Sequence, residues 1–344
     1  MTQLKILYAI QGTGNGHISR AREIIPILQT FGELDILISG HQSDVGLSFP
    51  IQYQLNGLSF VFGKKGGIDL FQTFKKSKLK RLFKDIKSLP VEKYDVIIND
   101  FEPVSAWACK LKGIPCIGLS HQAAVINPLS PKPTKFDPIG KLVLKKYAPV
   151  TSSYGFHFEK YDTNIYTPVI RKEIRTANPK KAGHYTVYLP AYSEDWLIKV
   201  LSKIDTTSFQ VFCKNATQKK VVGNIKIFPI DNLEFIKSMV NSNGVLCGAG
   251  FETPAEVLFM KKKLLVIPMK GQFEQQCNAE ALHKLGVPVI KKFDTRYLSI
   301  VQKWINNDQK INIDFPDETA KIISMIIMRH SKDKKFTQIK KINT

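Results

Sequence analysis

Short apolar runs alternate with segments of helical periodicity along this chain, and the alternation stops once and then restarts. Apolar runs separated by helices are typical of parallel strands in a sheet that is covered on both faces. The expected strands are residues 4–10, 34–39, 51–55, 96–99 and 116–119 in the first half, and 185–189, 209–213, 225–228, 244–247, 264–268 and 287–290 in the second. The sequence therefore predicts two α/β units, each built on a doubly wound parallel sheet.

The break between the two units contains Pro168, Pro179 and Gly183, and residues 167–183 are interpreted as an interdomain linker. At 344 residues the chain is long enough for two domains. We expect the following parts: an N-terminal domain at 1–166, a second domain at 184–315, and a last amphipathic helix with a basic tail at 316–344. Because the carboxyl ends of the strands of both sheets would face each other, ligands are expected to bind in an interdomain cleft.

The formal net charge of +21, from 50 Lys and Arg against 29 Asp and Glu, is the one unusual bulk property. Basic proteins often bind polyanions such as nucleic acid, anionic membranes or phosphorylated substrates. A lysine-rich surface can also have no binding function. The chain has no recognition-helix or RNA-module motif. The charge keeps a basic nucleic-acid-binding protein as an alternative function. Because the motifs are missing, no nucleic-acid partner is expected.

Cysteine spacing and hydropathy indicate the compartment. The five cysteines show no C-x-x-C spacing, which argues against a zinc site or a disulfide framework and favours free thiols in a reducing cytoplasm. The first residues lack the regions of a signal peptide, and no stretch approaches 18 uninterrupted apolar residues. We therefore expect a cytoplasmic protein.

A glycine-rich loop, Gly12-Thr13-Gly14-Asn15-Gly16-His17, follows the first expected strand and opens the first helix. Gly14, Asn15 and Gly16 would let the backbone approach an acceptor or a phosphate at the helix N-terminus. The loop departs from the G-x-G-x-x-G dinucleotide fingerprint, which argues against a nicotinamide or flavin site. His17 could accept a proton from a hydroxyl near neutral pH, or it could simply cap or pack in the loop.

Further polar residues follow other strands of the first half. Asp100 closes one strand and could orient His17 or bind acceptor hydroxyls; the alternative is a helix-capping Asp with Glu102 in the first turn. His121 follows the next strand and is a second candidate base, ranked below His17.

A second glycine turn, Gly248-Ala249-Gly250, follows a strand of the second half, and a helix begins near Glu252-Thr253-Pro254. Such a helix start points backbone amides at an anion such as a pyrophosphate. Glu256 lies on the same helix and could accept hydrogen bonds from two ribose hydroxyls. Gln272, Glu274, Gln275 and Asn278 then place acceptors and amides in one short loop, as a polyhydroxyl ring requires; a solvated loop is the alternative.

These motifs resemble the donor-binding signature of the family 1 and family 28 glycosyltransferases, in which a proline-ended strand precedes [D/E]-Q-x-x-N. Pro268 and Glu274-Gln275-x-x-Asn278 match that ending. The N-terminal loop is similar to the G-G-T-G-G-H loop of the lipid-linked N-acetylglucosaminyltransferase of peptidoglycan synthesis and of diacylglycerol glycosyltransferases. It also resembles a bacterial and archaeal glycosyltransferase group with G-x-G-x-G-H-x-x-R. The resemblance implies a GT-B fold of two Rossmann-like domains that face an interdomain cleft.

By this resemblance the chain is expected to be an inverting hexosyltransferase that moves a sugar from a UDP-sugar co-substrate to an acceptor hydroxyl. His17 would be the general base, with Asp100 beside it. The implied donor residues are Gly248, Ala249, Gly250 and Phe251 at the diphosphate, Glu256 at the ribose, Ile230 at the uracil, Gln272, Glu274 and Gln275 at the sugar, and Asn278 near the phosphates. The chain has no D-x-D pair, so neither a metal nor another cofactor is expected. Glu252 departs from the small residue usual at its place. A UDP-sugar 2-epimerase on the same fold is an alternative function.

Residues 70–89 read as a basic amphipathic helix. Its apolar side is Phe71, Phe74, Leu79, Leu82, Phe83 and Ile86, and lysines and an arginine take the other side. Such a helix could lie on the anionic inner face of the cell membrane, and the acceptor would then be a lipid or a lipid-linked glycan. The alternative is a helix packed on the core with a solvated basic face.

Overall fold

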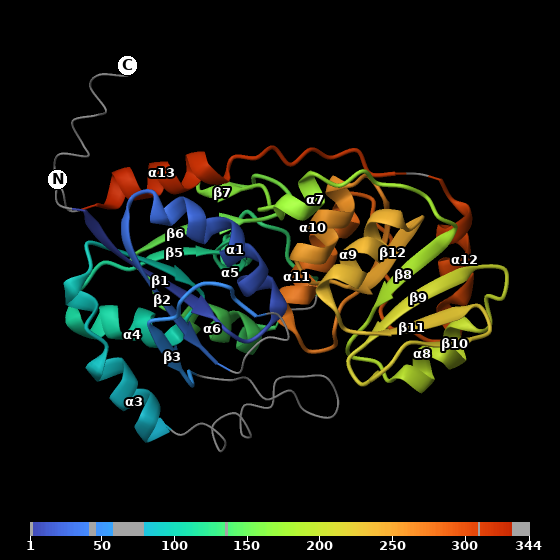
Figure 1. Ribbon diagram of the computed structural model, residues 1–344, viewed down its shortest axis with the longest axis horizontal. Helices are drawn as coiled ribbons and strands as arrows, with labels where there is room; N and C mark the ends of the chain where they lie inside the picture. The colour runs from blue at the N-terminus through green and yellow to red at the C-terminus, as the bar shows by residue number, and fades with distance from the viewer. Residues whose placement is uncertain (1–2, 41–45, 58–78, 135–136, 309, 332–344) are drawn as a thin grey trace.

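The computed structural model describes residues 3–40, 46–57, 79–134, 137–308 and 310–331, which form two α/β domains lying side by side (Figure 1). The N-terminal domain holds a seven-stranded sheet in the order β3-β2-β1-β4-β5-β6-β7, and every neighbouring pair is parallel. Its strands are β1 (Leu4–Gln11), β2 (Gly32–Ser39), β3 (Tyr53–Leu55), β4 (Val96–Asp100), β5 (Ile117–Ser120), β6 (Ser152–Phe156) and β7 (Ile165–Tyr166). Its helices are α1 (Asn15–Gln29), α3 (Leu79–Ser88), α4 (Pro103–Lys112), α5 (His121–Ile126) and α6 (Pro138–Tyr147), with a 3₁₀ turn at Val91–Lys93.

The second domain holds a six-stranded sheet in the order β10-β11-β9-β8-β12-β13, parallel except for the β10–β11 pair. Its strands are β8 (His184–Tyr188), β9 (Ser208–Cys213), β10 (Lys220–Val222), β11 (Ile225–Pro229), β12 (Gly244–Gly248) and β13 (Lys263–Ile267). Its helices are α8 (Glu194–Leu201), α9 (Asn232–Asn241), α10 (Glu252–Phe259), α11 (Phe273–Lys284) and α12 (Leu298–Asn306), with a 3₁₀ turn at Thr295–Tyr297. The short helix α7 (Lys172–Arg175) lies in the segment between the two domains.

The predicted fold class of two Rossmann-like parallel-sheet domains is confirmed, and so are ten of the eleven predicted strands, with small shifts at their ends. The prediction for residues 287–290 is wrong. Only Val289 pairs there, in an isolated bridge to Val266. Pro288 has no amide hydrogen to donate to a ladder, which limits the pairing to this bridge.

The last helix, α13 (Thr319–His330), returns to the N-terminal domain and packs along α1 (Figure 1). Its buried face consists of Ile322, Ile323, Ile326 and Ile327, and it joins the cluster that holds Ile18, Ala21, Ile25 and Leu28 of α1. The same apolar cluster continues into the second domain through Phe251 and Ala255. The two domains therefore share a continuous core at the base of the cleft.

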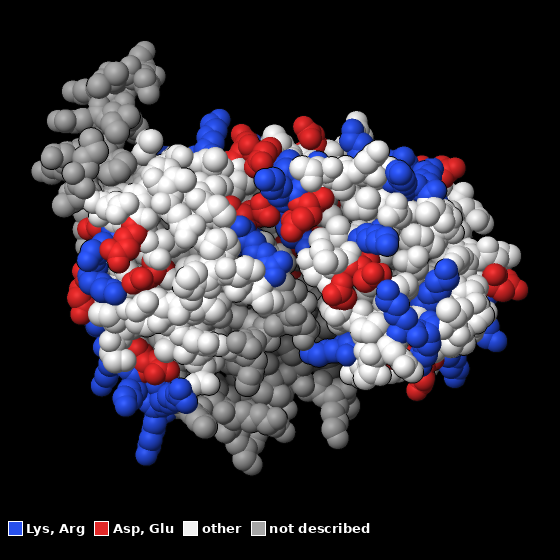
Figure 2. All heavy atoms as spheres, viewed as in Figure 1, with Lys and Arg blue, Asp and Glu red and all other residues white. Residues whose placement is uncertain are grey.

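Helix α3 only partly matches the amphipathic pattern expected for residues 70–89. Leu82 and Ile86 are buried in the cluster that includes Val104 and Ala108 of α4. Phe83, expected on the same apolar side, is 57% exposed, so that part of the prediction is wrong. Lys80, Arg81, Lys84 and Lys87 are exposed around it, and basic side chains gather over α3 at the lower left of Figure 2. Residues 70–78 of the expected helix lie outside the described residues.

Within the described ranges, no helix is both long enough and apolar enough to cross a membrane.

Candidate active site

A cleft of about 840 Å³ opens between the two domains at the carboxyl ends of their strands. One wall comes from the loop after β1, the start of α1 and the start of α5. The other wall comes from the loops after β11, β12 and β13. Of the residues expected to bind substrates, Gly14, Asn15, Gly16, His17, His121, Ile230, Gly250, Phe251, Glu256, Gln272, Glu274 and Gln275 line this cleft.

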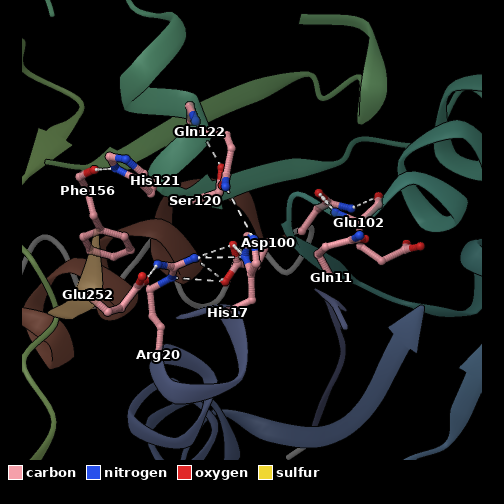
Figure 3. A network of polar contacts seen from close by, with 12 residues as sticks. Gln11, His17, Arg20, Asp100, Glu102, Ser120, His121, Gln122, Phe156 and Glu252 are labelled. Carbon is pink, nitrogen blue, oxygen red and sulfur yellow. Dashed lines mark hydrogen bonds and ion pairs between the residues drawn. The ribbon is translucent and has the colours of Figure 1, made fainter. Parts of the chain in front are cut away.

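His17 and Asp100 meet on the N-terminal wall. His17 Nδ1 lies 2.9 Å from Asp100 Oδ1, and the Asp100 side chain is fully buried behind the imidazole (Figure 3). Because an ionised carboxylate can only accept, Nδ1 carries the proton and Nε2 is left as the acceptor. Nε2 belongs to a residue that lines the cleft, whereas the Asp100 carboxylate is fully buried and does not line it.

Arg20, one turn after His17 on α1, completes this network and was not singled out as a site residue from the sequence. Its Nη2 donates to both Asp100 oxygens, at 2.7 and 2.8 Å, and its Nε donates to Oδ2 at 3.1 Å. Burial alone would raise the pKa of Asp100, but the Arg20 guanidinium and His17 outweigh it and hold that pKa below its usual value. Asp100 is therefore ionised at neutral pH although it is buried.

Glu102, not Asp100, caps helix α4. The Glu102 carboxylate accepts hydrogen bonds from the backbone amides of Val104 at 2.7 Å and Ser105 at 2.6 Å. Phe101 between them has φ of 58°, and this left-handed residue turns the chain so that Asp100 and Glu102 serve different partners. The alternative that Asp100 caps the helix is therefore wrong.

The glycine turn Gly248-Ala249-Gly250 leads into α10, which has no side-chain cap at its N-terminus. Backbone amides at an uncapped helix start carry partial positive charge and suit an anion. Phe251, the residue before the helix, stacks on His121 with ring centroids 3.9 Å apart and planes 5° from parallel. Ala249 is fully buried, and Gly248 ends β12 directly behind the turn. The turn is therefore held rigidly against the N-terminal domain.

His121 and Asn278 form a buried pair under this turn. His121 Nδ1 lies 2.8 Å from the Phe156 carbonyl oxygen, and its Nε2 lies 2.8 Å from Asn278 Oδ1. Asn278 Nδ2 donates to the Ala249 carbonyl oxygen at 3.1 Å. With both ring nitrogens engaged, His121 is a structural group in this arrangement and not a second base. Asn278 reaches the glycine turn from behind, not through the cleft.

Glu256 forms an ion pair that the sequence did not reveal. Arg171, from the interdomain segment, donates through Nε to Glu256 Oε1 at 2.5 Å and through Nη2 to Oε2 at 2.7 Å. Arg171 also donates to Asn232 Oδ1 at 2.8 Å. Burial raises the pKa of Glu256, and Arg171 partly offsets that rise. The residue expected at the ribose is thus fixed by the chain that joins the domains.

The polar loop after β13 contacts both walls. Gln275 Oε1 accepts from the Met269 amide at 2.9 Å, which fixes the loop. Gln122 of α5 donates to Glu274 Oε2 at 2.9 Å, and its Nε2 lies 3.4 Å from His17 Nε2. The side-chain oxygens of Gln122 and Gln272 are buried and have no hydrogen-bond partner in the described part of the chain. Both residues line the cleft, so two unpaired acceptors belong to its wall.

The sequence matches the family described as Glycosyl transferase family 1 over residues 4–307. A search of curated proteins gave no match. The fold is similar to that of MurG from Acinetobacter baumannii (TM-score 0.53, 13% identity, 94% of this chain and 99% of that one). It is also similar to the glycosyltransferase SnogD from Streptomyces nogalater (0.54, 13%, 95% and 100%) and to Phytolacca americana UGT2 complexed with UDP-2fluoro-glucose and pterostilbene (0.57, 11%, 98% and 98%).

Proposed function

The chain belongs to glycosyl transferase family 1, and we propose that it transfers a hexosyl group with inversion from a UDP-sugar to an acceptor hydroxyl. One observation carries the proposal: the His17–Asp100 pair on one wall of the cleft faces the uncapped start of α10 on the other. The first supplies a base for an acceptor, and the second supplies a site for a leaving diphosphate.

The reaction is a direct displacement at the anomeric carbon. The acceptor O–H gives its proton to His17 Nε2 while the acceptor oxygen forms a bond to that carbon. The bond from the carbon to the β-phosphate oxygen breaks, and its electron pair leaves with UDP. Attack from the face opposite the leaving group inverts the configuration. The amides at the start of α10 offset the charge that develops on the leaving oxygen, so the proposal requires no metal or other cofactor.

The donor would lie along the loops of the second domain. The diphosphate would contact the turn at Gly250, the uracil would lie near Ile230, and the ribose would reach Glu256. Gly250, Ile230 and Glu256 all line the cleft. Gln272 and Glu274 then remain for the hydroxyls of the transferred sugar, where the unpaired Gln272 oxygen needs a donor.

The acceptor proposal rests on the surface of α3. Phe83 is exposed among four cations there, and a ring that protrudes from a basic surface can enter the headgroup region of an anionic membrane. We propose a lipid or lipid-linked glycan as acceptor and a cytoplasmic enzyme that binds the inner face of the cell membrane.

The test is transfer activity with UDP-sugars, measured as UDP release and as glycoside formation. His17→Ala is expected to lower kcat at least about 100-fold, because a positioned base contributes about that factor or more. UDP affinity should stay within about twofold, since His17 is on the opposite wall. His283→Ala, an exposed histidine at the end of α11, is the control and should keep full activity. Full activity of His17→Ala would contradict the proposed base, and an epimerised UDP-sugar formed without acceptor would indicate a 2-epimerase.

A further inference from the structure

Glu252 reaches across the cleft from the donor-binding domain to the N-terminal domain. It lies in the first turn of α10, and its carboxylate accepts a hydrogen bond from Arg20 Nη1 (Figure 3). The Arg20 side chain is 2% exposed and that of Glu252 is 22% exposed, so the pair is largely shielded from solvent. Ion pairs with so little exposure are screened less by salt than surface pairs are.

The first turn of α1 provides the second part of this contact. Neither an acidic residue nor a side-chain cap belongs to that turn, so its positive end has no partner from its own helix. A Cβ atom added at Gly16 would collide with Glu252 Oε2. The carboxylate therefore lies directly against the backbone at the start of α1. The glycine loop expected to receive an acceptor or a phosphate receives, at Gly16, a carboxylate of the same chain.

Arg20 links this contact to the base. Its guanidinium is shared between Asp100, which orients His17, and Glu252 of the other domain. Without Glu252, the positive charge of Arg20 would act on Asp100 alone. It would then cancel the negative charge of Asp100, which is needed to stabilise a protonated His17. With Glu252 in place, the group of Arg20, Asp100, Glu252 and protonated His17 has no net charge. Contact between the domains thus improves the charge balance when His17 takes up a proton.

We propose that Glu252 is a positioning residue: its carboxylate docks on Arg20 and the start of α1, and through Arg20 and Asp100 this makes His17 an effective base when the domains are in contact. The assignment rests on the proposed function. Glu252 also adds negative charge beside the helix start that would hold the donor diphosphate. Glu252 therefore lowers the affinity for the nucleotide but raises kcat.

Glu252→Gln separates these effects, because it removes the charge and keeps most of the shape. UDP should bind about fivefold more tightly, as expected when one nearby partly screened negative charge is lost. In the same variant kcat should fall about tenfold or more, since a shielded charge pair has been broken. Glu252→Asp keeps the charge but is too short to dock, so kcat should fall without tighter UDP binding. Glu194→Gln is the control: it removes an acidic residue from the first turn of α8, paired with Lys220, and should change neither quantity.

Hydrogen exchange without nucleotide tests the docking by itself. Loss of the Glu252 carboxylate in Glu252→Ala should speed exchange in the first two turns of α1 severalfold, because that helix start loses the carboxylate that lies against Gly16. If the wild-type protein binds no UDP, the proposed function fails while this measurement still decides the docking. Unchanged exchange, unchanged kcat in Glu252→Gln, or weaker UDP binding together with lower kcat would each overturn the assignment.

Discussion

The ion pair between Arg171 and Glu256 predicts a pH-dependent loss of stability when the arginine is removed. Arg171→Met keeps much of the apolar stem and takes away the guanidinium. The carboxylate of Glu256 is 2% exposed and receives two hydrogen bonds from Arg171, at 2.5 and 2.7 Å. Removing one partner of such a buried pair destabilises a protein by about 3–5 kcal/mol, and we expect a loss in this range at pH 7.

The loss should be smaller at pH 5. Burial already raises the pKa of Glu256 above its usual 4.5, and without Arg171 to offset it that pKa rises further. The folded variant then binds more protons than the unfolded chain in the window above 4.5, so its stability decreases as pH rises through that window. A further rise of the Glu256 pKa by one corresponds to about 1.4 kcal/mol of folding free energy. Wild type should show a weaker dependence because Arg171 offsets part of the rise in the pKa of Glu256.

Urea unfolding at pH 5 and pH 7, followed by tryptophan fluorescence, measures both effects; Trp196 and Trp304 lie in the second domain and Trp107 in the first. Lys172→Met, an exposed lysine next in the chain, should be close to wild type. The double variant Arg171→Met with Glu256→Met should recover about 2–3 kcal/mol relative to the sum of the single variants, because no charge is left unpaired. Strict additivity, or an equal loss at both pH values, would refute the reasoning.

Two further predictions concern the sugar and the membrane. Gln122→Ala should weaken binding of a UDP-sugar about fivefold, the worth of one hydrogen bond, and leave UDP binding unchanged in calorimetry; equal losses for both ligands would contradict a role at the sugar. Phe83→Ser should change the free energy of unfolding by less than about 0.5 kcal/mol because the ring is exposed, yet reduce cosedimentation with anionic vesicles severalfold; undiminished sedimentation would contradict membrane binding through α3.

The sequence was sufficient for the fold because most strands are apolar runs that need no knowledge of their neighbours. The strands it missed lack this signal. β6 has the sequence Ser-Ser-Tyr-Gly-Phe and β10 has the sequence Lys-Val-Val, so neither carries an apolar run as long as a typical strand. β7 has only two residues, which is too short for any periodicity. These strands form because they pair with adjacent strands of the sheet: β6 with β5, β7 with β6, and β10 with β11.

Candidate site residues could be identified from the sequence where they lie in a short motif. They could not be identified where they act through an ion pair with a residue far away in the sequence. His17 and the polar loop at 272–278 stand out by their spacing after glycine turns and strands. Arg20 and Glu252 are 232 positions apart, and Arg171 and Glu256 are 85 apart. The only signals for them were Arg20 in the G-x-G-x-G-H-x-x-R pattern and the unusual acidic residue at 252. Neither signal indicates which residue is the ion-pair partner, because the packing of the two domains decides which side chains meet across the cleft.

The return of α13 to the N-terminal domain has a consequence for the order in which the chain can fold during synthesis. The apolar face of α1 is covered by a helix that ends at His330, so the N-terminal domain leaves the ribosome before the second domain but is completed after it. The second domain, from β8 to α12, has all its described strands and helices once residue 306 has emerged. Until residues 319–330 have also emerged, α1 keeps an apolar face uncovered, and chaperones can bind the nascent N-terminal domain there.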